Sequence, residues 1–211
     1  MTPESPLTGA PGLTRDTAAE VGSGPRPFVR IHADESCLGN QFEDRANPGG
    51  AGALVETWVD DQWVRRDLWL SESGTTNNRM ALRSAIEPFL ALTRGCQVLF
   101  VSDSQYLVRG FTEWRPSWKR RGWKRKTGPI ENLDLWKELD EVATRHTIEW
   151  RWTKGHAGHA YNEYADMMAV RAATELTTSE GFAESGFLAW LASERSDRRR
   201  YLDFNEDEPP A

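Results

Sequence analysis

One short segment limits the fold of this chain more than any other. Residues 97–102, with the sequence QVLFVS, place apolar side chains on consecutive positions and lead directly into Asp103. Such a run is typical of a strand that is buried on both of its faces, as in sheets that carry packed helices. We therefore expect a strand over 96–102 that is buried on both faces.

The flanking segments predict the rest of this sheet. Three strand-like segments come first, at 28–34, 51–58 and 63–70. A helix follows at about 79–92, where Thr75 to Asn78 can cap its start and Pro88 predicts a kink. Helical and strand patterns then alternate, with helices beginning at 106, 132 and 162 and a strand at 147–152. This order predicts an α/β domain with a mixed sheet, followed by a short packing helix at about 182–191.

Composition divides the chain into three regions. Residues 1–27 are rich in Pro, Gly, Thr and Ala without aliphatic periodicity, so we expect a flexible N-terminal tail. The folded domain is expected at 28–174, and a C-terminal extension with an acidic tail at 175–211. No apolar run reaches the roughly 18 to 20 residues of a membrane span, and the first residues lack the features of a signal peptide. These observations favour a cytoplasmic protein, and nothing in the sequence indicates more than a monomer.

The charges are unevenly distributed. A net charge of −6 argues mildly against a nucleic-acid partner. However, the segment from Arg115 to Lys126 holds seven basic residues and no acidic one, with tryptophans between them. That pattern favours contact with nucleic acid, although Trp118 and Trp123 fit a core position equally well. Cys37 and Cys96 are too isolated for a disulfide framework or a zinc site.

Three aspartates stand at similar places in the expected fold. Asp34 lies in the first strand, Asp103 follows the buried strand, and Asp166 lies in the first turns of a late helix. Strand ends and helix starts converge on one edge of such a sheet, so the three carboxylates can share a site. Taken singly, each aspartate reads as a helix cap or a surface residue. A shared cluster needs a divalent cation, Mg²⁺ or Mn²⁺, to offset the repulsion between its charges.

Five segments carry a resemblance to a known family. They are DESCLGN at 34–40, TTNNRM at 75–80, SDSQYLVRG at 102–110, WKRRGW at 118–123 and WTKGHAGHAYNEYAD at 152–166. Together, and in this order, they resemble the bacterial-type ribonuclease H family over about residues 28–174. The resemblance implies a ribonuclease H-like α/β fold, with a mixed five-stranded sheet, helices on both faces and a basic protrusion.

The resemblance also implies an activity. It is hydrolysis of the RNA strand of RNA–DNA hybrids, in which Asp34, Asp103 and Asp166 hold two Mg²⁺ ions about 4 Å apart and Mn²⁺ can substitute. His156, the first histidine of KGHAGH, matches the family position that assists proton movement or product departure. His159 is better interpreted as structural.

Substrate contacts are implied at further positions. Asn77, Asn78 and Gln105 match residues that read 2′-hydroxyls and base edges in a wide minor groove. Cys37, Asn40 and Thr76 lie in segments that approach the nucleic-acid backbone. The basic protrusion is matched by Trp114, Trp118, Lys119, Arg120, Arg121, Trp123 and Lys124, whose rings and charges suit the DNA strand of a hybrid.

The chain departs from the family pattern at two positions. The family continues TTNNRM with a metal-binding glutamate, but this chain has Ala81, and an alanine methyl cannot bind a metal. Glu35 stands where the family has a glycine. Because neighbouring side chains of a strand point to opposite faces, we expect Glu35 to reach the metals beside Asp34 only if the strand bends or ends there.

Other carboxylates are weaker candidates for the missing ligand. Glu87 lies six positions after Ala81 on the same helix and points away from it. Glu43 and Asp44 fall in an apparent loop insertion that can fold back, although solvated loop charges are the simpler interpretation. An alanine introduced by engineering would give the same sequence.

Two functions stay open on the sequence. The first is an active endonuclease with three aspartates and a substitute fourth ligand, because the histidine and the substrate-reading residues persist. The second is a module that binds hybrids or double-stranded RNA without cutting them, for which Ala81 is the whole case. A more distant nuclease of the same fold, such as a transposase or a Holliday-junction resolvase, fits poorly with KGHAGH and the basic segment.

Overall fold

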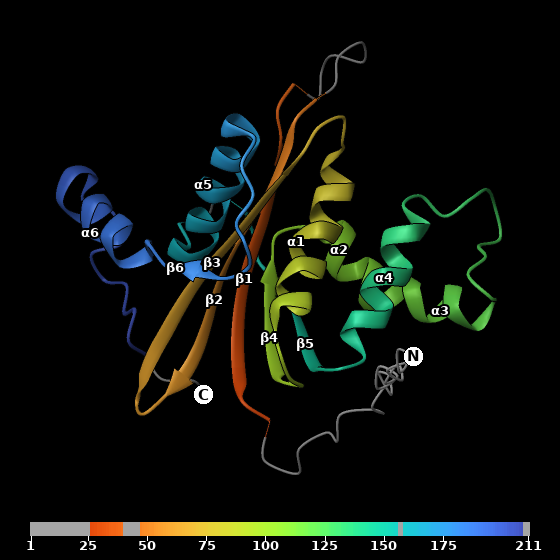
Figure 1. The fold of residues 1–211 in the computed structure, drawn as a ribbon, viewed down its shortest axis with the longest axis horizontal. Helices are drawn as coiled ribbons and strands as arrows, with labels where there is room; N and C mark the ends of the chain where they lie inside the picture. The colour runs from red at the N-terminus through yellow and green to blue at the C-terminus, as the bar shows by residue number, and fades with distance from the viewer. Residues whose placement is uncertain (1–25, 40–46, 156–157, 209–211) are drawn as a thin grey trace, which may run out of the picture.

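The fold is built on a mixed sheet of six strands (Figure 1). The structure is a computed structural model that describes residues 26–39, 47–155 and 158–208. The strands lie in the order β5-β4-β1-β2-β3-β6, with β1, β4 and β5 parallel and the other neighbours antiparallel. Their bounds are β1 Phe28–Cys37, β2 Gly49–Val59, β3 Gln62–Glu72, β4 Gln97–Ser102, β5 Thr147–Trp152 and β6 Ala183–Glu184.

Helices cover both faces of this sheet, as expected. Helix α1 packs on β1 and β2 on one face together with α4, and α5 packs on β1, β2 and β3 on the other (Figure 1). The helices are α1 Asn77–Ala91, α2 Gln105–Arg109, the π-helical turn η1 Gly110–Trp114, α3 Arg115–Arg120, α4 Leu133–Ala143, α5 Ala160–Glu175 and α6 Phe187–Arg198. Helix α1 is capped by the Thr76 side chain and continues through Pro88.

Two expectations for the C-terminal part were wrong. The sheet has six strands instead of five, because β6 pairs with β3 through Arg66 and Asp67. The helix expected at 182–191 begins only at Phe187. The Asp67 carboxylate accepts hydrogen bonds from Ser185 Oγ at 2.7 Å and from the Gly186 amide at 3.0 Å, which turns the chain between β6 and α6.

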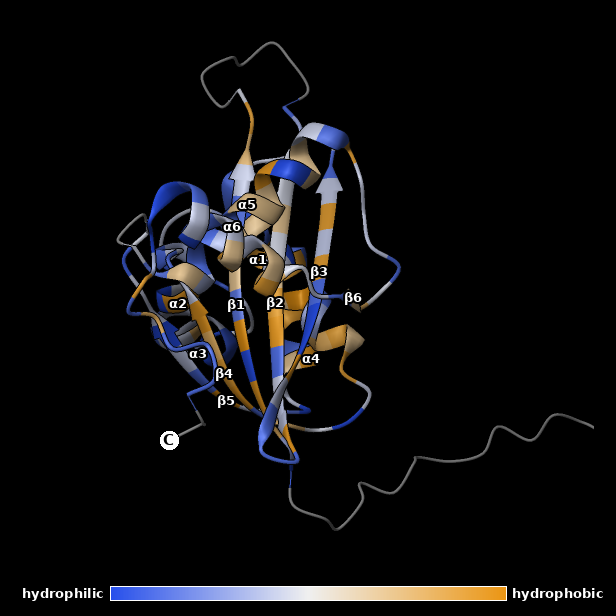
Figure 2. Cartoon of the chain, turned by 90° about the vertical axis from the view of Figure 1, so that its left-hand side faces the viewer, coloured by the Kyte–Doolittle hydropathy of each residue, from blue (hydrophilic) through white to orange (hydrophobic). Residues whose placement is uncertain are grey.

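Alternation along β1 assigns its side chains to the two helical layers. Val29, Ile31 and Ala33 belong to the main hydrophobic core with residues of α1 and α4. The intervening positions Arg30, His32 and Asp34 face the α5 side, because side chains alternate along a strand. Figure 2 shows hydrophobic residues concentrated on β2 and β4 in the middle of the sheet. Within the described residues, no helix combines the length and the apolar character that crossing a membrane requires.

Two glycines of β2 allow α5 to lie close to the sheet. Gly52 pairs with Asp34, and a Cβ atom at Gly52 would lie 2.5 Å from the carbonyl oxygen of Ala165. A Cβ at Gly50 would collide with the backbone of Ala169 and Ala173. Any larger residue at these positions would push α5 away from the end of β1. The close packing therefore holds the start of α5 against the strand that carries Asp34.

Candidate active site

A cluster of carboxylates lies where β1 and β4 end. Asp34, Glu35 and Asp103 each offer one carboxylate oxygen, and these oxygens all lie within 4.8 Å of one another. Asp34 is buried, and Glu35 and Asp103 are half-buried. Three acidic groups at this separation form a set of hard oxygen ligands of the kind that Mg²⁺ and Mn²⁺ prefer.

Glu35 was expected to reach the metals only if the strand bends or ends there, but β1 does not end at this residue and Glu35 still lies in the cluster. The strand runs to Cys37, and Glu35 pairs with Ala51 in the regular register of β2. The neighbouring β4 stops at Ser102, which lies opposite Ala33. Beyond Ala33, no strand among the described residues pairs with β1 on its β4 side. Side chains from both faces of β1 can reach this open edge, where Asp103 follows β4.

Burial and mutual repulsion disfavour the charged forms of these groups. The pKa of Asp34 rises to about 9, first through burial and then through the charges of Asp103, Glu35 and Asp166, against a hydrogen bond from the Glu35 amide. The pKa of Glu35 rises to about 8, first through burial and then through the charge of Asp103. Its Oε2 atom is buried without a hydrogen-bond partner among the described residues. A divalent cation between these oxygens would relieve both the repulsion and the unpaired acceptor.

Helix α5 contributes two further groups. Asn162 donates from Nδ2 to Oδ2 of Asp34 at 3.0 Å, while the Glu35 amide donates to Oδ1 at 2.7 Å. Both oxygens of Asp34 are thereby oriented. Asp166 stands one turn after Asn162 and lies outside the group defined by 4.8 Å, although its charge raises the pKa of Asp34. Asn162 was not identified from the sequence, since its role depends on the close approach of α5.

Residues at the end of β5 and just after it contact Asp103 from the other side. Trp152 donates from Nε1 to the Asp103 carbonyl oxygen at 2.9 Å. Gly155 lies so close that a Cβ atom there would collide with the Asp103 carboxylate. The glycine that follows Lys154 is therefore required by the space around a site residue. The sequence pattern placed this glycine in the loop but did not reveal its contact.

Ala81 is fully buried on α1, and its surroundings are apolar. It belongs to the main core together with Ile31 and Ala33, which share a face of β1 with Glu35. Glu87 forms an ion pair with Arg83 at 3.0 Å, consistent with its expected direction away from the site. The candidates Glu43 and Asp44, as well as Asn40 and His156, lie outside the described residues.

The start of α1 lies beside the end of β1. Cys37 Sγ is 3.6 Å from the carbonyl oxygen of Thr75, and Thr76 accepts a hydrogen bond from Arg79 as the helix cap. Thr76 and Asn77 are exposed and Asn78 is half-buried. Exposed Gln105 begins α2, two residues after Asp103. The two segments expected to read the substrate thus begin near the edge that carries the carboxylates.

In the basic segment, the tryptophans pack against the core and several basic side chains are exposed. Trp118 is buried and packs edge-on against Trp136 at 5.6 Å, which favours the core interpretation of this residue. Trp114 and Trp123 are partly buried against the same core. Lys119 Nζ lies 2.7 Å from Asp140, an acidic residue of α4 that also binds Arg115. Arg120, Arg121 and Lys124 are exposed.

Comparison with known proteins gives consistent results. The sequence model of the RNase H family, described as "RNase H", matches residues 26–174. Ribonuclease H of Stutzerimonas stutzeri is 46% identical over 145 residues, which is 68% of this chain and 90% of that protein. Ribonuclease H of Pseudomonas fluorescens is 46% identical over 149 residues, covering 70% of this chain and 92% of that protein.

A solved structure is similar at the level of the fold as well. The crystal structure of LC9-RNase H1, described as a type 1 RNase H with the type 2 active-site motif, superimposes with a TM-score of 0.75. It is 51% identical, and the match covers 81% of this chain and 83% of that one. A similar protein is therefore described as carrying the active-site motif of the other RNase H type.

Proposed function

This chain belongs to the ribonuclease H family, whose activity is endonucleolytic cleavage of the RNA strand of RNA–DNA hybrids, and we propose that Asp34, Glu35, Asp103 and Asp166 carry that reaction here. This assignment is supported by the positions of Asp34, Glu35 and Asp103, whose carboxylates lie close together at one edge of the sheet. Asp166 lies on the adjoining helix α5. Because all of these residues come from one chain, we propose that the protein acts as a monomer.

Glu35 is proposed as the ligand that compensates for Ala81. The observation that carries this assignment is the position of its carboxylate, which has one oxygen within 4.8 Å of those of Asp34 and Asp103 and a buried oxygen without a hydrogen-bond partner in the described part of the chain. A glutamate that pointed into solvent would have neither property. The similar crystal structure described as having the type 2 active-site motif supports a family member with an altered set of ligands.

Mg²⁺ is the proposed cofactor, and Mn²⁺ should substitute for it. The donor set fits such an ion, because it consists of carboxylates, and burial and neighbouring negative charge raise the pKa values of two of them, Asp34 and Glu35. Bound there, a pair of divalent cations would supply an activated water and stabilise the leaving oxygen. The protein's own contribution is to orient Asp34 through Asn162 and to hold Asp103 against Gly155.

The hybrid is proposed to lie across the start of α1 and the start of α2. Asn77, Asn78 and Gln105 present amide groups there, which can read the 2′-hydroxyls of an RNA strand. The exposed charges of Arg120, Arg121 and Lys124 suit the phosphates of the DNA strand. We assign this binding to residues 28–174 and regard residues 175–211 as an extension packed on that domain.

The competing hypothesis of a binding module without cleavage depended on the loss of the fourth carboxylate at Ala81. Glu35 supplies a carboxylate in the same cluster, so the enzyme is the better-supported proposal. His156, which lies outside the described residues, is kept as a proposed participant in proton movement or product departure.

Cleavage of a labelled 12- to 20-nucleotide hybrid, a length of about one to two helical turns, tests the proposal. We expect cleavage of the RNA strand in Mg²⁺, and a loss of at least about 100-fold in Glu35→Gln, since losing a metal ligand removes several kcal/mol of transition-state stabilisation. Glu87→Gln is the matched control, because Glu87 lies in α1 and binds only Arg83 among the ion pairs identified. Full activity of Glu35→Gln would contradict the assignment of Glu35, and inertness of the unaltered chain would contradict the proposed enzyme.

A further inference from the structure

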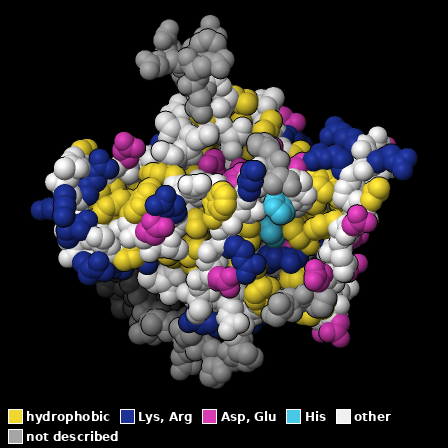
Figure 3. Space-filling view, turned by 180° about the vertical axis from the view of Figure 1, so that it is seen from behind, with side chains coloured by type: hydrophobic (Ala, Val, Ile, Leu, Met, Phe, Trp, Pro, Cys, Tyr) yellow, Lys and Arg dark blue, Asp and Glu magenta, His cyan; other side chains and the backbone are white. Residues whose placement is uncertain are grey.

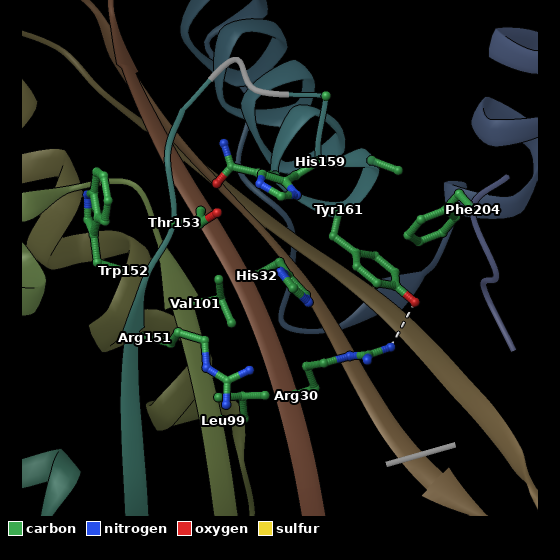
Figure 4. Close-up of a pocket in the computed structure, with 13 residues that line it drawn as sticks. Arg30, His32, Leu99, Val101, Arg151, Trp152, Thr153, His159, Tyr161 and Phe204 are labelled. Atoms are coloured by element: carbon green, nitrogen blue, oxygen red, sulfur yellow. Dashed lines mark hydrogen bonds between the residues drawn. The ribbon is translucent and has the colours of Figure 1, made fainter. Parts of the chain in front are cut away.

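A second cavity lies on the α5 side of the sheet, beside the carboxylate cluster. It has a volume of about 280 Å³, opens to solvent, and is lined by residues of β1, β4 and β5, of the start of α5 and of the C-terminal extension. Figure 4 shows Arg151, His32, His159 and Tyr161 arranged around its interior, with Phe204 at the side of the C-terminal extension. Asn162 lines the cavity and also binds Asp34, so it forms part of the wall between the two sites.

The first feature of this cavity is the start of α5. The first amides of a helix have no partner within it, and the side chain of the cap residue His159 forms no capping hydrogen bond. The first hydrogen bond from a later residue comes from the Glu163 amide to the His159 carbonyl. The amides of Ala160, Tyr161 and Asn162 therefore remain available, and all three residues line the cavity. Such a helix start attracts anions.

The second feature is the charge of the walls. None of the described residues that line the cavity is acidic, although the chain as a whole carries a net charge of −6. Arg30 and Arg151 line it, but Arg30 is held by Glu56 at 2.7 Å and by Tyr161 Oη at 2.7 Å. Arg151 forms only an exposed ion pair with Glu149, which it can exchange for a ligand at little cost. Figure 3 likewise shows histidine side chains beside Lys and Arg side chains on the surface seen from behind.

One acidic residue does stand in the first turn of α5. Glu163 is occupied elsewhere, because its carboxylate binds Arg200 of the C-terminal extension and is absent from the cavity wall. Its pKa falls below the usual range despite burial, through the Arg200 side chain and the backbone of Gly158. The helix start therefore faces the cavity without a competing carboxylate in the wall.

The third feature is an unpartnered polar atom. His32 lines the cavity from β1, and its ring stacks on Tyr161 with the centroids 4.5 Å apart. Its Nε2 atom is buried and has no hydrogen-bond partner among the described residues. Buried polar atoms are rarely left unpaired, so an unpaired nitrogen in the wall of a cavity indicates a missing ligand group or solvent molecule. This observation is independent of the helix start and concerns a residue that lines the same cavity.

We propose that this cavity binds a phosphate monoester, with the phosphate at the start of α5 and the attached organic group along the aromatic and aliphatic wall. A phosphate offers several acceptor oxygens, which match the three amides, the Arg151 guanidinium and the Thr153 hydroxyl. Leu99, Val101 and the rings of Tyr161 and Phe204 provide an apolar wall for a nucleoside-sized body. The source is either a free mononucleotide or the phosphorylated 5′ end of a nucleic-acid strand.

Calorimetric titration with adenosine 5′-monophosphate tests this site on the full chain. The buffer contains EDTA, so that phosphate cannot bind through a metal held by the carboxylate cluster. Adenosine, inorganic phosphate and a 5′-phosphorylated dinucleotide serve as the other probes. Arg151→Ala is compared with Arg171→Ala, since both arginines are exposed and each forms one ion pair with a glutamate, but Arg171 lies outside the cavity wall.

We expect saturable binding that is weakened about tenfold in Arg151→Ala and unchanged in Arg171→Ala, as for loss of one charged hydrogen bond. The NMR signals of the amides of Ala160, Tyr161 and Asn162 should shift in the same titration. Binding of the mononucleotide would identify a free nucleotide as a sufficient ligand, and binding of the phosphorylated dinucleotide alone would identify a strand end. Absence of binding by all phosphate probes, binding of adenosine equal to that of the monophosphate, or equal weakening in both variants would overturn the proposal.

Discussion

Replacement of Asp34 by asparagine should stabilise the metal-free protein, although it removes a proposed ligand. Asp34 has a pKa of about 9 in the folded protein, against 3.8 as its ordinary value, chiefly because of burial and then the charge of Asp103. A carboxyl with a raised pKa favours folding fully at pH values below the unfolded pKa. That contribution is lost as the pH rises toward the folded pKa. The free energy of unfolding of the metal-free protein should therefore fall between about pH 4 and pH 9.

The size of the effect follows from the same shift. Between the ordinary pKa and pH 7 lie about 3 pH units, and each corresponds to about 1.4 kcal/mol, which sets an upper limit of roughly 4 kcal/mol. Because the site shares its protons among several carboxyls, we expect about 1–4 kcal/mol at pH 7, and the difference should grow further as the pH approaches 9. Asparagine keeps an acceptor for the Glu35 amide, and Asn162 can turn its own amide to accept from the new side chain.

Urea denaturation in EDTA, at pH 4.5 and at pH 8.5, measures this difference. Asp34→Asn should match the unaltered protein at the lower pH and exceed it at the higher pH. Glu113→Gln is the control, because Glu113 is exposed and pairs only with Arg109 among the contacts identified. Excess Mg²⁺ should reverse the order by stabilising the unaltered protein through binding. Equal pH slopes for Asp34→Asn and the unaltered protein, or a variant less stable at pH 8.5, would refute the electrostatic reasoning.

Three further substitutions test neighbouring parts of the structure. Gly155→Ala should slow hybrid cleavage at least about tenfold, since the new methyl displaces the Asp103 carboxylate by a distance that matters for catalysis; steady-state kinetics equal to those of the unaltered chain would contradict this. Ala81→Glu should lower the free energy of unfolding in EDTA by about 2–4 kcal/mol, because it buries another charge in the core. The same substitution should not raise the cleavage rate. A faster enzyme would show that the cluster lacked a ligand. Tyr164→Phe should cost about 1–3 kcal/mol in urea denaturation, because Asp67 loses its 2.5 Å donor inside the protein, and an unchanged midpoint would count against that bond.

The central strands could be predicted from sequence because their signals are local. The consecutive apolar residues at 97–102 and the capped helix after Thr76 each depend on a few neighbouring side chains. β6 could not be predicted in this way, because a two-residue strand has almost no pattern of its own. Its place is decided by hydrogen bonds to Asp67, more than a hundred residues earlier in the chain.

The same distinction applies to the site. Sequence reasoning identified Asp34, Asp103 and Glu35 as candidates, and the structure brings their carboxylates together. It misjudged how Glu35 could reach the cluster, because strand alternation was applied without knowing that β4 ends opposite Ala33. The sequence of the basic segment also could not show which of its charges are paired, because Asp140, which neutralises Lys119, lies on another helix. End points of neighbouring strands and contacts between helices are properties of the folded chain.

Diffraction from crystals of the unaltered protein soaked in Mn²⁺ tests the role of Glu35 most directly. Anomalous scattering locates the metal independently of the side chains around it. We predict a Glu35 carboxylate oxygen within about 2.3 Å of a metal that is also bound by Asp34 or Asp103, which is the bonding range for hard divalent cations and oxygen. A metal held by the aspartates, with both Glu35 oxygens outside bonding range, would contradict the proposal that this residue replaces the missing glutamate.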